Sequence, residues 1–181
     1  MVNLLLLTSL VMAQDVRNQV TNPSQAKALT SRIEPDNNVF GIPFGIKEDE
    51  FVAAYGRPTG YIRLNSDETI MIYGKSHGFV FDEEKLVGVR ISFSIVDWKL
   101  TNTSNTPTQF DGIKWRLNNG LAADTNLKEA KRLLGSALVI KANQYVYTTS
   151  KARVELDFAQ LPGDGEGDEL FKVVGVYVRL K

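Results

Sequence analysis

Several residue types that commonly build functional sites are missing or scarce in this chain of 181 residues. There is no cysteine, which excludes disulfide bridges, zinc–thiolate sites, iron–sulfur clusters, a thiol nucleophile and the acylated cysteine of a bacterial lipoprotein. The single histidine, His77, excludes a metal site built from several histidines. Lys and Arg together number 21, as do Asp and Glu, so the formal net charge is zero. Because a nucleic-acid-binding protein needs a basic surface, we expect no nucleic-acid partner.

The chain also lacks a hydrophobic run long enough to cross a membrane as a helix, which takes about 20 apolar residues. Its apolar stretch at residues 2–13 has instead the length of the hydrophobic region of a secretory signal peptide. Val11 and Ala13 would occupy the −3 and −1 positions of the cleavage site. No Lys or Arg precedes the stretch, so the alternative is a buried or frayed N-terminal strand. We predict a secreted or periplasmic protein, cleaved near Ala13, with no lipid anchor and no stable membrane insertion.

One short segment of the chain occurs twice. Residues 85–91 read Lys-Leu-Val-Gly-Val-Arg-Ile, and residues 172–178 read Lys-Val-Val-Gly-Val-Tyr-Val, with the glycine at the same place. A predicted helix that ends in glycine precedes each copy, at residues 46–55 and 125–134, and Asp124 is the expected N-cap of the second helix. An internal repeat of this kind predicts the architecture of a chain before any local pattern does.

Runs of β-branched and aromatic residues predict antiparallel hairpins after each helix. Short turns separate the runs of the first copy, whereas a glycine- and acid-rich insertion at residues 160–169 separates the last two runs of the second copy. The expected strands are 69–73, 78–81 and 86–95 in the first copy, and 144–148, 152–158 and 171–180 in the second. A further run at residues 110–117 alternates Ile113, Trp115 and Leu117 on one side. This alternation predicts a strand at the edge of the second sheet or a bridge between two units.

These patterns together predict the fold class and the division of the chain. We expect an α+β protein of two tandem repeats, each a helix or helical hairpin packed on a three- or four-stranded antiparallel sheet. The first repeat would span residues 40–100 and the second residues 101–181, with a polar connector at 101–109. Residues 14–39 are polar and contain two prolines, so we expect a leader or linker after the signal peptide at residues 1–13.

The order of these features resembles the small α+β repeat shared by β-lactamase inhibitory protein and the SmpA/OmlA (BamE-type) outer-membrane assembly lipoproteins. The resemblance rests on a helix that ends in glycine, a turn after a tyrosine-rich strand, and the Lys-aliphatic-Val-Gly-Val strand. The positions that carry it are Phe51, Gly56, Pro58, Tyr73, Gly74, Phe79, Phe81, Leu86, Gly88 and Val89, then Leu134, Gly135, Tyr147, Val154, Leu156, Val173, Gly175 and Val176. Two tandem copies resemble the inhibitor more than the lipoproteins, which implies a protein-binding role.

Three acidic residues alternate with glycines near the end of the chain, at Asp164, Glu166 and Asp168. Such spacing is typical of calcium loops, because this hard cation takes about 6–8 oxygen ligands around a tight turn. Gly175 stands where a calcium loop carries its bidentate glutamate, so the alternative is a solvated hairpin loop. We expect no cofactor. Calcium is the one metal ion that the sequence suggests, at these three residues.

His77 offers little support for catalysis. A general base needs an orienting partner and a nucleophile within reach, and the turn around His77 supplies neither. The glycine-rich stretch at residues 163–167 lacks the Lys-Ser/Thr pair of a phosphate-binding loop. We therefore expect no enzymatic activity.

Aromatic residues on or beside the expected strands are the candidates for a recognition surface. Helices on one face of an antiparallel sheet leave the other face partly open, and Tyr and Trp dominate binding hot spots. The candidate protein-binding residues are Tyr73, His77, Trp98, Trp115, Tyr145 and Tyr147. We predict a non-catalytic module, inhibitor-like or associated with the cell envelope, that binds another protein through its open sheet face and the turn at residues 74–78.

Two alternatives stand beside this prediction. The two tryptophans, Trp98 and Trp115, would hold the repeats together instead of contacting a partner. The groove between the repeats would bind a small ligand or a cell-wall fragment, in which case an enclosed pocket with a few convergent polar groups is expected there.

Overall fold

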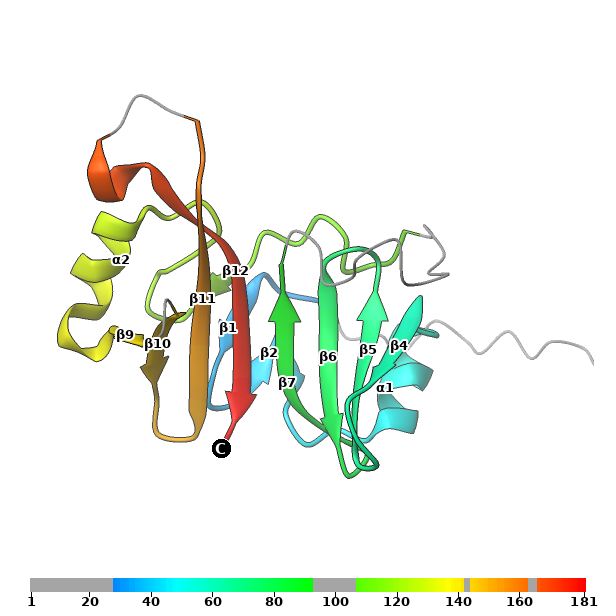
Figure 1. Ribbon diagram of the computed structural model, residues 1–181. Coiled ribbons are helices and arrows are strands. Elements are labelled where there is room, and N and C mark those ends of the chain that lie inside the picture. The colour runs from blue at the N-terminus through cyan, green and yellow to red at the C-terminus, as the bar shows by residue number, and fades with distance from the viewer. Residues whose placement is uncertain (1–27, 93–106, 142–143, 163–165) are drawn as a thin grey trace, which may run out of the picture.

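The computed structural model describes residues 28–92, 107–141, 144–162 and 166–181. Within these ranges the chain is mostly β, with twelve strands in two sheets and two α-helices (Figure 1). The predicted signal peptide and residues 14–27 of the predicted linker lie outside the described residues.

The large sheet has eight strands in the order β4-β5-β6-β7-β12-β11-β10-β9, and every neighbouring pair is antiparallel. Its strands are β4 (Gly60–Arg63), β5 (Glu68–Tyr73), β6 (His77–Asp82), β7 (Lys85–Ile91), β9 (Val139–Lys141), β10 (Gln144–Thr148), β11 (Ala152–Gln160) and β12 (Phe171–Leu180). The β-branched and aromatic runs of the sequence therefore form strands, and short turns make neighbours of β5 and β6, of β6 and β7, and of β10 and β11.

The two copies of the repeated segment, β7 and β12, pair with each other at the centre of the large sheet. Each strand shifts register against its hairpin partner, β7 at Val80/Phe81 of β6 and β12 at Asp157/Phe158 of β11. The extra residues of these two β-bulges are Val87 and Val174, and a glycine follows each of them.

Gly88 and Gly175 allow the two central strands to approach each other. A Cβ atom on Gly88 would lie 2.6 Å from the carbonyl oxygen of Val178, and one on Gly175 would lie 2.9 Å from that of Ile91. Both separations are shorter than a carbon and an oxygen tolerate, so any larger residue would push the strands apart. The packing of β7 against β12 thus explains why the glycine recurs in the repeated segment.

The small sheet has four strands in the order β3-β2-β1-β8 and packs on one face of the large sheet, behind it in Figure 1. Its strands are β1 (Arg32–Glu34), β2 (Asn38–Val39), β3 (Ile42–Pro43) and β8 (Arg116–Leu117). Phe40 and Gly41 form the two-residue turn between β2 and β3 with φ values of 57° and 84°, as in a type I′ turn. The part of the predicted linker from residue 28 onward thus contributes β1 and β2, and Ile33 is fully buried.

Two helices of eight residues, α1 (Glu48–Tyr55) and α2 (Leu127–Leu134), pack on the same core as the small sheet. Three acidic residues in the first turn of α1 lie where the helix dipole favours negative charge. The N-cap of α2 is Asn126, whose side chain accepts a hydrogen bond from the Glu129 amide, rather than the expected Asp124. Short 3₁₀ turns are η2 (Gly135–Ala137) and η3 (Gly167–Glu169).

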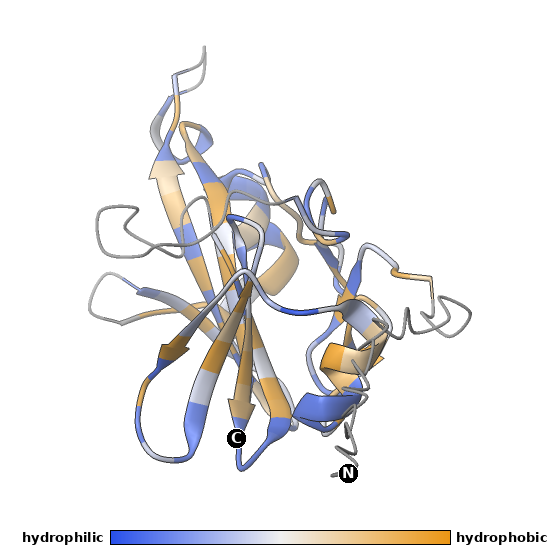
Figure 2. Cartoon of the chain, turned by 90° about the vertical axis from the view of Figure 1, so that its right-hand side faces the viewer, coloured by the Kyte–Doolittle hydropathy of each residue, from blue (hydrophilic) through white to orange (hydrophobic). Residues whose placement is uncertain are grey.

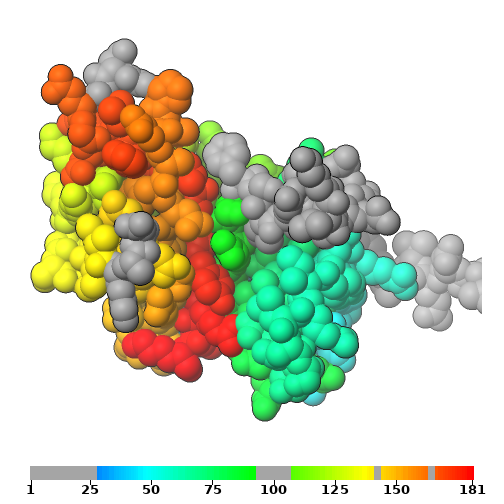
Figure 3. All heavy atoms as spheres, viewed as in Figure 1, coloured from blue at the N-terminus to red at the C-terminus, as the bar shows by residue number. Residues whose placement is uncertain are grey.

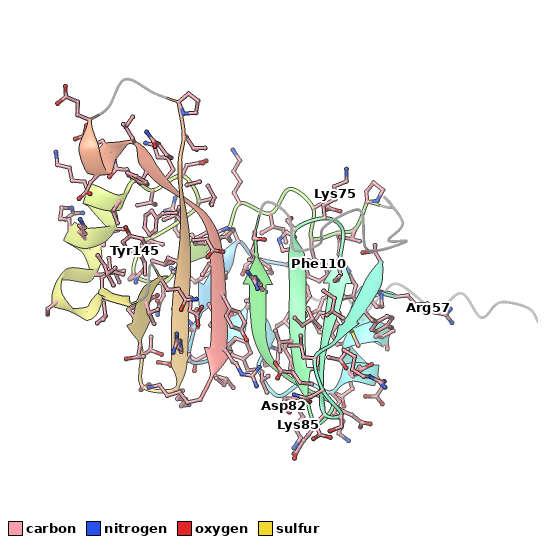
Figure 4. The ribbon with its side chains drawn as sticks, in the orientation of Figure 1. Arg57, Lys75, Asp82, Lys85, Phe110 and Tyr145 are labelled. Carbon is pink, nitrogen blue, oxygen red and sulfur yellow. The ribbon has the colours of Figure 1, made fainter. Side chains whose placement is uncertain are left out.

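An aromatic cluster fills the space between α1, the large sheet and the loop before β8. Phe51 of α1 is fully buried and its ring lies 4.8 Å from that of Phe79 and 5.6 Å from that of Tyr73. Phe110, labelled in Figure 4, contacts Phe51 and Phe79 from the loop side. The side view in Figure 2 shows α1 and the strands of the large sheet on opposite sides of this core.

The predicted α+β class with two helix-on-sheet repeats is wrong. The expected last strand of each repeat pairs with the other, so the strands form one continuous sheet instead of two three- or four-stranded sheets. The helices are only eight residues long, and β8 lies in the small sheet instead of at an edge of the large one. The protein is therefore a mostly β protein with one shared core rather than two α+β units.

Candidate functional site

The two faces of the large sheet differ in what lies on them. One face, which we call the covered face, packs against the helices and the small sheet and carries the buried core. The opposite face is turned toward the viewer in Figures 1 and 3, and we call it the open face. In Figure 3 the surface is hollowed along β12, between the β10–β11 side and the side formed by β4 to β6.

Strand alternation places charged and aromatic side chains on the open face of the central strands. Arg90 of β7 lies opposite Tyr177 of β12, which lies opposite Glu155 of β11. In the next row, Arg179 of β12 lies opposite Arg153 of β11. Because paired residues of antiparallel strands point to the same face, these five side chains form one continuous patch, which we call the central patch.

The position beside Arg179 in its row is Gly88, which has no side chain. The long side chain of Arg179 reaches across the sheet, where its guanidinium pairs with Glu68 of β5 and lies 3.3 Å from the carboxylate of Asp82 of β6. Burial lowers the pKa of Arg179, but the interactions with Tyr177 and Glu68 outweigh this effect and raise it. These contacts hold the guanidinium in one position, with only 30% of the side chain exposed.

A groove of about 420 Å³ lies on the patch, between β11 and β12 and toward the end of the chain. Its lining residues are Arg153, Glu155, Tyr177, Arg179, Leu180 and Lys181. The Nε atom of Arg153 lies 2.8 Å from the carboxylate of Glu155, and Lys181 Nζ donates to the carbonyl of Thr149 at 2.7 Å. The groove thus combines three cationic side chains and a tyrosine with one carboxylate.

The open face is different on β5 and β6. There Glu68 and Asp82 lie at the strand ends beside Arg179, while the residues farther along the same face are apolar and buried. Ile70 is 9%, Ile72 1% and Val80 0% exposed, and none of these three belongs to the main core cluster. We therefore confine the candidate site to the central patch and its groove.

Four of the predicted binding residues are buried on the covered side of the large sheet instead of lying on the open face. Tyr73 is 0%, His77 2%, Trp115 4% and Tyr147 5% exposed. The hydroxyl of Tyr73 donates to the Gly56 carbonyl at 2.7 Å. The hydroxyl of Tyr147 accepts from the side-chain nitrogen Nδ2 of Asn119 at 3.4 Å. Burial raises the pKa of both tyrosines, that of Tyr147 to about 12. These side chains therefore lie in the interior of the protein.

The other two predicted binding residues differ from these four. Tyr145 is half-buried on the covered face, where its ring lies 4.6 Å from that of Phe158. Trp98 lies outside the described residues. The structure thus brings none of the predicted aromatic residues that it describes to the open face. Tyr177, which it does bring there, lies on the expected strand at residues 171–180 but was not one of the six candidate binding residues.

The only histidine is held in an apolar environment. Its ring lies 5.7 Å from that of Phe40 and 6.1 Å from that of Phe110. Nδ1 is 3.1 Å from the Ser76 hydroxyl, and Nε2 has no hydrogen-bond partner among the described residues. Burial lowers the pKa of His77 to about 4, and the nearby Asp111 opposes this shift only in part.

The acidic residues of the predicted calcium site are only partly described, because Asp164 lies outside the described residues. Glu166 is exposed, while Asp168 pairs with Lys131 of α2 at 2.6 Å. Its neighbour Glu169 pairs with Lys128 at 2.8 Å. Among the described residues no group of three acidic or histidine side chains could hold a metal ion. The two lysines of α2 thus engage the acids that follow the loop.

The arginines of the central patch were not among the candidate binding residues, although the sequence contains a pattern that indicates their exposure. The run Arg153-Val154-Glu155-Leu156-Asp157 alternates charged and aliphatic residues, as expected for a strand with one face in the core. The strand itself was predicted at residues 152–158, but none of its charged side chains was among the candidate binding residues.

None of the helices among the described residues has the length and apolar character needed to cross a membrane.

A scan against protein-family models and a search of curated proteins find no match. Among solved structures, the chain is similar to an extracellular protein containing an SCP domain from Bacillus anthracis str. Ames, with 12% sequence identity and a TM-score of 0.38. The alignment covers 75% of this chain and 43% of that chain, so this chain spans less than half of the other. A similarity at this level carries no argument about fold or function.

Proposed function

We propose that the protein is an exported, non-catalytic module that binds another protein through the central patch of its open face. The observation that carries the proposal is the contrast between the two faces of the same strands. On the covered face the side chains of β7, β11 and β12 are buried, while on the open face Arg90 and Arg153 are exposed. Tyr177 and Arg179 between them are half-buried.

The residue types of the central patch support a protein partner. Arg and Tyr are enriched among the residues that contribute most to protein–protein binding, because each offers a large contact area together with hydrogen-bond donors. The contacts of Arg179 with Glu68, Asp82 and Tyr177 reduce the side-chain entropy that binding would cost. The strands themselves form a rigid base, since backbone hydrogen bonds join each of them to a neighbour on both sides.

The non-catalytic and exported parts of the proposal rest on other observations. The only histidine is 2% exposed, so it cannot reach a substrate at the surface. Export rests on the apolar stretch at residues 2–13 of the sequence. A small-ligand site between two repeats has little support, because the groove that we describe is lined by β11, β12 and the last residue of the chain.

The proposal is tested by affinity capture from the extracellular and cell-envelope fractions with matched variants. One variant combines Arg90→Ala and Tyr177→Ala in the central patch. The control combines Arg57→Ala and Tyr61→Ala at the β4 side of the sheet, where both side chains are exposed. Arg57 is labelled in Figure 4 on that side of the molecule.

We expect a protein that is retained by the wild type and by the control but lost by the patch variant. Thermal unfolding of all three proteins establishes that they are folded before capture. Equal retention by both variants, or no specific partner for the wild type, would contradict the proposal.

A further inference from the structure

We infer that the groove of the central patch binds carboxylate groups, supplied by acidic side chains of the protein partner. This inference rests on the proposed function and adds the chemistry of the contact. The groove is formed by Arg153, Glu155, Tyr177, Arg179 and Lys181, together with Leu180.

The charges around the groove favour an anion. Three of its lining side chains are cationic and one is a carboxylate, and Arg90 adds a further exposed cation in the neighbouring row. The chain as a whole has no net charge, so this local excess is a property of the site and not of the composition. Glu68 and Asp82 pair with Arg179 and offset part of this excess, so four cationic side chains stand against three carboxylates. The remaining positive charge attracts an anionic group and helps to orient it.

The cationic groups are positioned by contacts that leave donors unused. Arg153 donates Nε–H to Glu155, and the two terminal nitrogens of its guanidinium have no hydrogen-bond partner among the described residues, so they can bind a ligand. Lys181 uses Nζ for one carbonyl oxygen of Thr149, and an ammonium group has three donors. The Tyr177 hydroxyl belongs to a residue that lines the groove, and a hydroxyl can donate a hydrogen bond to an anion.

A carboxylate matches this arrangement better than a phosphate does. The planar guanidinium binds carboxylate and phosphate alike through two parallel hydrogen bonds, so the charge of the ligand decides between them. Glu155 lines the groove, and Glu68 and Asp82 lie on the far side of the Arg179 guanidinium. These three acids would repel a dianionic group more strongly than a carboxylate with a single charge. The groove therefore suits the side chain of Asp or Glu from a partner.

The test uses a defined probe, hexaglutamate, with hexaglutamine as the neutral peptide and inorganic phosphate as the other anion. Binding to the full chain is followed by chemical-shift changes in two-dimensional ¹H–¹⁵N spectra. We expect hexaglutamate to shift the amides of Arg153, Tyr177, Arg179 and Lys181, with weaker binding at high salt because the contact is electrostatic. Hexaglutamine and phosphate should leave these signals almost unchanged.

Two double variants separate the groove from general charge effects. Arg153→Gln with Lys181→Gln removes two positive charges from the groove, and we expect it to weaken hexaglutamate binding about tenfold. Lys128→Gln with Lys131→Gln removes the same charge from α2, where both lysines pair with acids at the surface. This control should bind the peptide as the wild type does.

Equal weakening in both variants, shifts scattered over the molecule, or phosphate binding as strong as peptide binding would each overturn the inference. Its failure differs from failure of the proposed function. If a partner is captured through the central patch but neither high salt nor the Arg153→Gln/Lys181→Gln change weakens its retention, only the carboxylate inference is wrong. If hexaglutamate binds in the groove but no protein is captured through the central patch, only the proposed function is wrong.

Discussion

The covered and open faces of the large sheet are built from the same strands but have opposite chemistry. On β12, Val176 and Val178 are fully buried in the core, while Tyr177 and Arg179 between and beside them lie on the open face. Most of the aromatic residues that were candidates for binding because of their residue type, such as Trp115 and Tyr147, are buried on the covered side. Aromatic character alone therefore does not identify the binding face, because large rings also stabilise the core. Substitutions that separate stability from binding test this division of roles.

The largest effect on stability is expected from Phe51→Ala, at the centre of the covered-face core. Phe51 is fully buried and its ring contacts those of Tyr73, Phe79, Phe81 and Phe110. Removal of the ring leaves a cavity and should lower the free energy of unfolding by about 3–5 kcal/mol. Chemical denaturation measures this change, with Tyr61→Ala at an exposed edge as the control. A loss of less than about 1 kcal/mol would show that the core is not packed as described.

The next effect concerns the pH dependence of stability, through His77. Its pKa is lowered by burial from 6.5 to about 4, so below pH 6.5 the unfolded chain binds a proton that the folded chain does not. The free energy of unfolding should therefore fall as the pH drops from 6.5 to about 4, by up to about 3 kcal/mol. Above pH 6.5 His77 is mostly neutral in both the folded and the unfolded chain, so it no longer lowers the free energy of unfolding. Denaturation across this pH range should show a shallower decline for His77→Phe, and identical slopes would contradict the buried, neutral state of the ring.

A smaller effect is expected from Gly88→Ala at the junction of the two central strands. The added methyl group would lie 2.6 Å from the carbonyl oxygen of Val178, which is part of the backbone. We expect a loss of about 1–3 kcal/mol in the free energy of unfolding, because β7 and β12 must move apart. Unchanged thermal stability would mean that the two strands do not approach as closely as described.

The smallest effect on stability is expected on the open face. Arg90 is exposed and lies opposite Tyr177, so Arg90→Ala should change the free energy of unfolding by less than about 0.5 kcal/mol. The same change should nevertheless weaken partner binding. A strong loss of stability in this variant would assign Arg90 a role in folding and not in recognition.

The local elements could be predicted from the sequence, because each depends on neighbouring residues. Alternating runs gave the strands of both hairpins, and Gly56 and Gly135 ended the helices as expected. The pairing of β7 with β12 could not be derived in the same way, since their register depends on contacts between segments far apart in the sequence. The error in fold class follows from this pairing, because two similar segments were read as two separate units.

An open sheet face could be predicted from the sequence, but the side chains that lie on it could not. The open sheet face was expected from the one-sided placement of helices, whereas Trp115 and Tyr147 were expected on it and are buried. Whether a ring of this size is buried depends on the loop before β8 and on α2, whose positions the strand pattern does not encode. The charged residues of β11 and β12 indicate the open face better than the aromatic residues do. They alternate with aliphatic residues, and this alternation determines which side chains point away from the core.

The comparison of the two affinities for the captured partner tests the central claim most directly. The dissociation constant is measured by calorimetry for the Arg90→Ala/Tyr177→Ala variant and for the Arg57→Ala/Tyr61→Ala control. If the central patch of the open face is the binding surface, the patch variant should bind about 30-fold more weakly than the control, which corresponds to about 2 kcal/mol. A ratio near one, with both variants as stable as the wild type, would contradict the claim.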